Sequence, residues 1–83
     1  MKKLNEMVGT IMFEILGGYY ENYFSHDDLE NEIEYSRYEI IIDWAKLCSE
    51  EEYNRLVEDP KVYQNIYDEA FDRAKKAVLA AIL

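Results

Sequence analysis

Apolar side chains recur every three or four positions between residues 3 and about 24, beginning with Leu4, Met7, Val8 and Ile11. An α-helix turns once every 3.6 residues, so this spacing places them on one broad face of a helix. Gly17 and Gly18 fall inside the pattern without ending it. They mark either a glycine cap or a thin place where a neighbouring element comes close. Because the apolar spacing resumes after them, we predict a helix that continues through both glycines.

A second helix is predicted over residues 26–47. Ser25 precedes it, and Asp28 stands three residues later, which has the shape of a capping box. One face of this helix would carry Leu29, Ile33, Ile40, Ile41, Trp44 and Cys48. A further apolar arc would carry Tyr35, Tyr38, Ile42 and Ala45. A helix that is apolar over such a width needs burial on two sides, either wholly inside the bundle or partly against another chain.

The rest of the chain predicts a short helix over residues 50–58 and a long one over residues 60–82. The first opens with the capping box Ser49-Glu50-Glu51-Glu52. Before the second stands Asp59-Pro60, in which the aspartate can cap and the proline can occupy the first helical position. The predicted fold class is therefore all-α. We expect one domain over residues 1–83, a compact bundle of three long helices and one short helix.

Charge is concentrated in the middle of the chain. The whole sequence has a net charge of −9, and residues 21–59 alone carry thirteen acidic and three basic side chains. Proteins that bind nucleic acid directly, or anionic membrane surfaces, present basic patches, so we expect neither kind of partner. The imbalance favours a basic protein partner, or simply solubility.

Part of this charge has a structural explanation. Acidic residues in first helical turns stabilise the helix dipole, and six occupy such positions: Asp27, Asp28, Glu30, Glu50, Glu51 and Glu52. Four more lie past the first turn of the predicted second helix: Glu32, Glu34, Glu39 and Asp43. On that helix a stripe about 60° wide would hold Asp28, Glu32, Glu39 and Asp43. Its like-charge i,i+4 pairs would each cost ~0.2–0.5 kcal/mol. The stripe is either a solvated face or a surface for a positively charged partner.

No group of residues predicts catalysis, and we expect a protein that is not an enzyme. His26 is the only histidine, and residues 27–35 place Leu29 and Ile33 where a calcium loop needs oxygen ligands. We therefore expect no metal and no cofactor. The single Cys48 cannot form an internal disulfide, which favours a reducing cytoplasm. Its position on an apolar face favours a buried, inert thiol.

We predict a small binding protein that blocks a basic, nucleic-acid-binding surface of a larger protein. Small acidic proteins of viral or mobile-element origin act in this way as DNA mimics against restriction, CRISPR (anti-CRISPR) or repair enzymes. The analogy here is one of size and charge, and it would place the protein in the host cell cytoplasm. The predicted partner-binding residues are Asp28, Glu30, Glu32, Glu34, Tyr35, Tyr38, Glu39, Asp43, Glu50, Glu51 and Glu52.

Two other functions fit the same features. An immunity protein or antitoxin that neutralises a nuclease toxin is also small, acidic and helical, and its gene would lie beside that of the toxin. A structural or assembly module would use its apolar arcs for self-association. The broad apolar face of the first helix and the apolar run over residues 77–83 predict self-association, most simply a homodimer.

Overall fold

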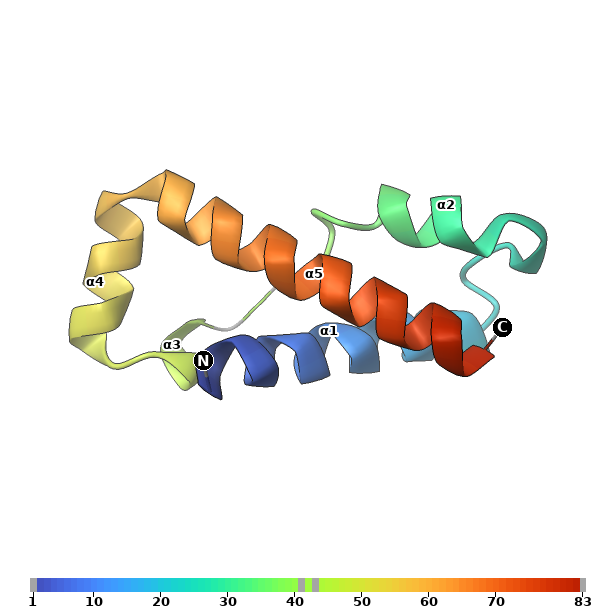
Figure 1. Cartoon of the computed structure of the whole chain (residues 1–83), viewed down its shortest axis with the longest axis horizontal. Coiled ribbons are helices and arrows are strands. Elements are labelled where there is room, and N and C mark those ends of the chain that lie inside the picture. The colour runs from blue at the N-terminus through green and yellow to red at the C-terminus, as the bar shows by residue number, and fades with distance from the viewer. Residues whose placement is uncertain (1, 41, 43, 83) are drawn as a thin grey trace.

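The computed structural model describes residues 2–40, 42 and 44–82, and these residues form helices joined by turns, with no β-strand among them (Figure 1). The all-α fold class is thereby confirmed for this part of the chain. The elements, in chain order, are α1 (Lys2–Tyr20), the 3₁₀ helix η1 (His26–Asp28), α2 (Leu29–Tyr35), α3 (Trp44–Leu47), α4 (Glu50–Glu58) and α5 (Pro60–Ile82). Two of them are long, rather than the three that were predicted.

The two long helices build the core. α1 and α5 lie side by side and run in the same direction, from left to right in Figure 1. Their buried side chains follow helical spacing on both partners: Leu4, Met7, Ile11 and Ile15 from α1, and Tyr67, Ala70, Phe71, Ala74 and Val78 from α5. Because the two helices are parallel, a long connection has to return the chain to the starting end. The shorter helices form that connection, and α2 closes the core with Leu29 and Ile33.

The helix α1 passes through Gly17 and Gly18 as predicted, but it ends at Tyr20 rather than near residue 24. Asn22 has a φ of 58°, in the left-handed region that asparagine tolerates. The N–H of Tyr23 donates to the carbonyl of Gly18 at 2.8 Å, and the N–H of Asn22 donates to that of Tyr19 at 3.2 Å. These two bonds make a Schellman C-cap, which ends the helix and turns the chain towards η1.

The prediction of a single helix over residues 26–47 was wrong, because α2 ends at Tyr35 and turns follow over residues 36–40. The buried Ser36 donates its hydroxyl to the carbonyl of Ile33 at 2.7 Å, and its N–H donates to the same oxygen at 3.0 Å. The N–H of Arg37 bonds the carbonyl of Glu34, again three residues back. These tight bonds replace the four-residue spacing of an α-helix and end it. Ser25 also makes no side-chain cap bond, so the first predicted capping box does not form.

The predicted starts of the last two helices are confirmed. At α4, the hydroxyl of Ser49 accepts from the N–H of Glu52 at 3.3 Å and donates to its carboxylate at 3.0 Å. At α5, Pro60 is the first residue, and a carboxylate oxygen of Asp59 accepts from the N–H of Lys61 at 3.2 Å. In Figure 1, α4 stands across the left end of the molecule and α2 lies at its upper right.

Candidate functional site

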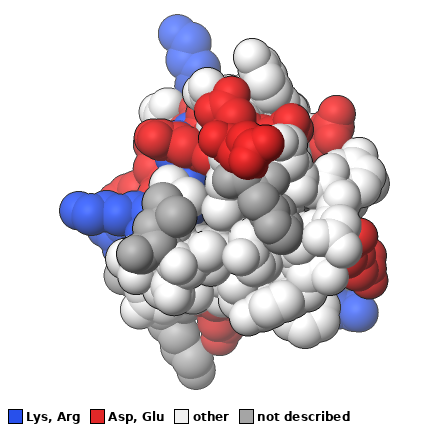
Figure 2. All heavy atoms as spheres, turned by 90° about the vertical axis from the view of Figure 1, so that its right-hand side faces the viewer, with Lys and Arg blue, Asp and Glu red and all other residues white. Residues whose placement is uncertain are grey.

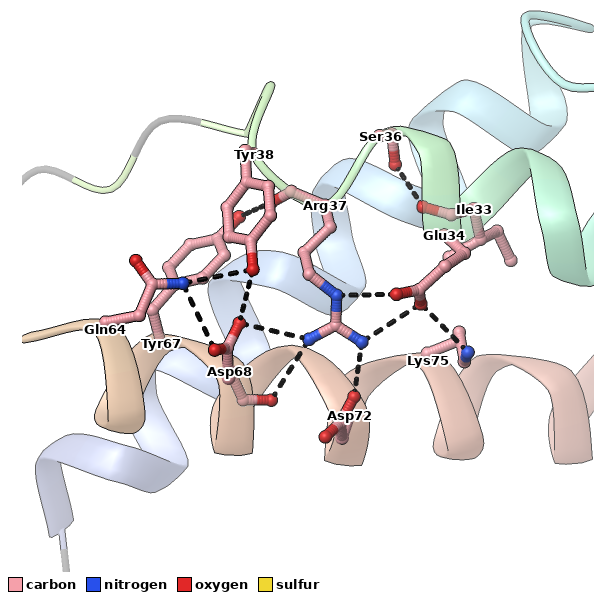
Figure 3. Close-up of polar contacts among 10 residues, drawn as sticks. All are labelled: Ile33, Glu34, Ser36, Arg37, Tyr38, Gln64, Tyr67, Asp68, Asp72 and Lys75. Atoms are coloured by element: carbon pink, nitrogen blue, oxygen red, sulfur yellow. Dashed lines mark hydrogen bonds and ion pairs between the residues drawn. The ribbon is translucent and has the colours of Figure 1, made fainter. Parts of the chain in front are cut away.

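An arginine fixes the turn after α2 onto α5 (Figure 3). The guanidinium of Arg37 bonds both carboxylate oxygens of Glu34, at 2.7 and 3.0 Å. It also reaches the carboxylates of Asp68 at 3.3 Å and Asp72 at 2.5 Å on α5. Its central carbon lies 4.5 Å from the centre of the Phe71 ring, which is within cation–π range. Arg37 is thus held by three carboxylates around its edge and one aromatic ring against its face.

This cluster occupies two of the predicted partner-binding residues. The hydrogen bonds from Arg37, with a further one from Lys75 at 3.0 Å, lower the pKa of Glu34 to about 2. Glu34 therefore stays ionised, and its charge is paired with Arg37 and Lys75 of the same molecule. The hydroxyl of Tyr38 donates to Asp68 at 3.2 Å, and its ring stacks on that of Tyr67. One of the predicted partner-binding carboxylates, that of Glu34, is thus already paired within the molecule.

Tyr67 of α5 bonds the backbone of the same turn. Its hydroxyl donates to the carbonyl of Arg37 and lies 3.2 Å from that of Ile40. Burial raises the pKa of Tyr67 to about 12, so the hydroxyl keeps its proton and remains a donor. Arg37 and Tyr67 together explain why α2 ends at this point. The side chain of Arg37 bonds carboxylates of α5. The carbonyls of Arg37 and Ile40 lie within hydrogen-bond distance of the Tyr67 hydroxyl, which also belongs to α5.

On the neighbouring face, the end of α1 and the turn after α2 enclose a groove. We call it the acidic aromatic groove. Its main part has a volume of about 560 Å³, and it is lined by Phe13, Glu14, Gly17, Gly18, Glu21, Tyr23, Phe24, Ser36, Glu39 and Ile40. An adjoining part of about 240 Å³ shares Tyr23, Phe24, Ser36 and Glu39 and adds Glu32 and Tyr35.

Three large aromatic side chains of the acidic aromatic groove face solvent. Phe13 is 75% exposed, Tyr23 72% and Tyr35 79%. Folded proteins normally expose large aromatic rings in a group only where another molecule covers them. Phe24 differs, because its ring is buried against Gly18 and forms part of the base.

The groove is also negatively charged. Of the described residues that line it, four are acidic (Glu14, Glu21, Glu32 and Glu39) and none is basic. Within the described ranges, the carboxylates of Glu32 and Glu39 have no hydrogen-bond or ion-pair partner. Figure 2 views the end of the molecule that carries η1 and α2, and it shows acidic side chains gathered near the top while Lys and Arg project mainly at the edges. With four carboxylates in its described lining, the groove would repel anions and attract cations.

The remaining predicted site residues do not join one surface. Asp28 accepts two hydrogen bonds from the amide of Asn31, and Glu30 is exposed on α2. The acids of α4 lie at the far end of a molecule 42 Å long (Figure 1). There Glu51 pairs with Arg55 and Glu52 belongs to the cap, while Glu50 is exposed. Asp43 lies outside the described residues.

The helix boundaries also change two earlier expectations. Because α2 begins at Leu29, Glu32 lies in its first turn, where its charge favours the helix dipole. The four-residue acidic stripe assumed one helix through residue 43, and that helix is absent. Glu32 and Glu39 nevertheless line the same groove, because the turn after α2 brings Glu39 back towards Tyr23 and Phe24.

Sequence reasoning missed the residues that α1 contributes, above all Phe13 and Glu14. One signal was present: Phe13 is the large apolar residue of this helix that does not fit the core spacing through Ile11 and Ile15. An aromatic side chain off the apolar face must be exposed unless another element covers it. Nothing in the sequence joined it to Tyr23 and Tyr35.

A second groove, of about 500 Å³, lies at the opposite end. It is lined chiefly by Met7, Leu47, Cys48, Leu56, Val62 and Ile66, with acidic residues and Arg55 at its edge. Cys48 is a half-buried free thiol there, rather than fully buried as expected. Within the described ranges no three His, Cys, Asp or Glu side chains are placed to share a metal ion. No helix in this part of the chain has the length and apolarity needed to cross a membrane.

Comparison of the chain with protein-family models, with curated proteins and with solved structures finds no match.

Proposed function

We propose that this protein is a non-enzymatic inhibitor that covers a basic, nucleic-acid-binding surface of a larger protein. The observation that carries the proposal is the acidic aromatic groove. It combines exposed rings with carboxylates and, in its described lining, no positive charge. Aromatic anchors surrounded by charge are typical of protein-binding surfaces, whereas a merely solvated acidic face needs no exposed rings.

The charge of the groove favours a particular class of partner. Surfaces rich in Arg and Lys on other proteins are most often the footprint of nucleic-acid binding. A protein with a net charge of −9 is attracted to such a surface, and attraction between opposite charges speeds association. By occupying the surface, the protein would exclude nucleic acid, which is inhibition of the DNA-mimic type.

A competition experiment tests this function. The protein is immobilised, a lysate of its native host is passed over it at low salt, and retained proteins are identified by mass spectrometry. Short duplex DNA is then added to the column. We expect a basic protein to be retained and then displaced by the DNA, and we expect added salt to release it too.

Charge-matched variants locate the interaction. Glu32→Gln with Glu39→Gln removes two carboxylates from the groove, and Glu6→Gln with Glu58→Gln removes two that lie outside it. We expect the first pair to weaken binding to the captured partner by about tenfold or more and the second pair to have a much smaller effect. A partner that DNA does not displace, or equal effects of the two pairs, would contradict the proposal.

A further inference from the structure

The protein already binds one of its own arginines, Arg37, between an aromatic ring and several carboxylates. The guanidinium of Arg37 lies 4.5 Å from the ring centre of Phe71, and carboxylates of Glu34, Asp68 and Asp72 accept its N–H groups. Only 13% of this side chain is exposed, so the arrangement retains a cation largely removed from water. The groups that surround Arg37 are therefore an aromatic face and several carboxylates.

The acidic aromatic groove also combines aromatic rings with carboxylates, and none of its described lining residues is basic. Phe13, Tyr23 and Tyr35 present exposed rings, and Glu39 stands in both parts of the groove. We propose that this groove is an arginine-binding site, and that its occupant is an arginine side chain on a basic segment of the partner protein. The inference rests on the proposed function and adds to it the chemical group that is recognised.

Arginine suits these surroundings better than lysine. Its guanidinium is planar, so it can lie flat against a ring while its N–H groups bond carboxylates in pairs. It is also less strongly hydrated than an ammonium group, so less is lost when it leaves water. Four acidic residues in the described lining make phosphate or nucleic acid an unfavourable occupant.

Gly17 leaves room in the groove for this occupant. A glycine inside a helix is destabilising compared with alanine, and here no contact requires one, because a Cβ at position 17 would meet no atom within 4 Å. Gly18 is different, since its missing side chain makes room for Phe24. Gly17 lines the groove, so its missing side chain leaves space in the groove itself. A larger residue there would take up that space without disturbing the core.

Two capped peptides, nona-arginine and nona-lysine, are the probes. Binding of each to the full chain is measured by calorimetry at low salt, and the contacted residues are mapped by amide chemical shifts. We expect nona-arginine to bind about tenfold more tightly than nona-lysine, with shifts centred on Gly17, Tyr23 and Glu39. Equal affinities, or shifts centred on α4, would overturn the inference.

Gly17→Gln is the decisive variant, and Gly9→Gln is its matched control. Both glycines lie within α1 and have open space around a Cβ, but Gly9 does not line the groove. We expect Gly17→Gln to reduce nona-arginine binding to the level of nona-lysine and Gly9→Gln to leave the preference unchanged. Phe13→Ala gives an independent test, because it removes an exposed ring and no core contact. A preference for arginine that survives both Gly17→Gln and Phe13→Ala would also overturn the inference.

The outcomes separate this inference from the proposed function. If the two peptides bind equally, or neither binds, the groove does not select arginine, while displacement of the captured partner by DNA can still support inhibition. If arginine is selected but DNA displaces no partner, the arginine site stands and the nucleic-acid-related function fails. Occupation by a second copy of this chain would appear as a dimer that Gly17→Gln dissociates, and it too would overturn the inference.

Discussion

Gly18 lies directly against the ring of Phe24: a Cβ built on Gly18 would stand 2.6 Å from Cε2 of that ring. Phe24 is buried, and the Schellman turn fixes the chain just before it, so the ring has little freedom to withdraw. The neighbouring Gly17 has open space at the same place. Two adjacent glycines of one helix therefore differ in their surroundings: Gly18 makes room for a buried ring, whereas Gly17 has none beside it.

We expect alanine at these two positions to change stability in opposite directions. Gly17→Ala should raise the free energy of unfolding by about 0.5–1 kcal/mol, because alanine favours the helix. Gly18→Ala should lower it by about 1–2 kcal/mol, because the added methyl group displaces a buried ring. Urea unfolding followed by circular dichroism measures both. Equal gains at the two positions would show that the ring moves aside freely.

Arg37 and Arg55 provide a matched test of the cluster on α5. Arg37→Lys should lower the free energy of unfolding by about 1–2 kcal/mol, because an ammonium group cannot bond three carboxylates in a plane and cover the Phe71 ring. Among the described residues Arg55 pairs with Glu51 alone, and it is 73% exposed, so Arg55→Lys should change stability by less than about 0.5 kcal/mol. Similar losses for the two variants would show that the contacts of Arg37 contribute little.

The ion pair of Glu34 should make stability depend on acid pH. Its pKa is lowered from 4.5 to about 2, chiefly by the hydrogen bond from Arg37. A group with a lowered pKa in the folded state contributes its full stabilisation above its ordinary pKa, and the contribution disappears as pH falls from about 4.5 to about 2. The shift corresponds to ~3 kcal/mol, which solvent screening of a 41% exposed side chain reduces to about 1 kcal/mol.

Unfolding of the parent and of Glu34→Gln should therefore differ at pH 7 and converge near pH 2. Glu30→Gln serves as the control, because it removes an exposed carboxylate of the same helix that has no partner in the described ranges. A difference between parent and Glu34→Gln that stays constant with pH would place the stabilisation elsewhere.

The two serines before helical segments should differ in importance. Ser49 caps α4 through the N–H of Glu52, whereas Ser25 makes no cap bond before η1. Ser49→Ala should lower the free energy of unfolding by about 1 kcal/mol, and Ser25→Ala should change it by a few tenths at most. Thermal melting of the two variants compares them directly, and a larger loss at Ser25 would contradict the assignment.

Self-association remains a prediction of the sequence, and the exposed apolar residues of α4 and the start of α5 offer it a surface. Tyr53, Val57 and Val62 are exposed there, and no described side chain of α4 is fully buried. We expect sedimentation equilibrium to give twice the chain mass of 9.9 kDa at micromolar concentration, and Val57→Lys to shift it towards the monomer. A parent that sediments as a monomer would show that these residues stay in water.

The sequence alone determined the elements whose signals are local. The start of α4 at its Ser49 cap and the start of α5 at Pro60 could be placed because caps and proline act within one turn of the helix. The core faces of α1 and α5 could be assigned because helical periodicity is a property of neighbouring residues. The ion pairs Glu51–Arg55 and Glu69–Arg73 were likewise predictable from their spacing.

Only the tertiary structure decided where the second helix ends and what the candidate site contains. The apolar pattern continues past Tyr35, but bonds from Arg37 and Tyr67 between the turn and α5 outweigh local helical preference. The same folding back directs Glu34 inwards and leaves Glu32 and Glu39 in the groove. Phe13 lines the same groove as Glu39, although it belongs to α1, which ends at Tyr20. Which residues share this groove depends on the packing of α1, α2 and α5 around one core, and no spacing along the chain encodes that packing.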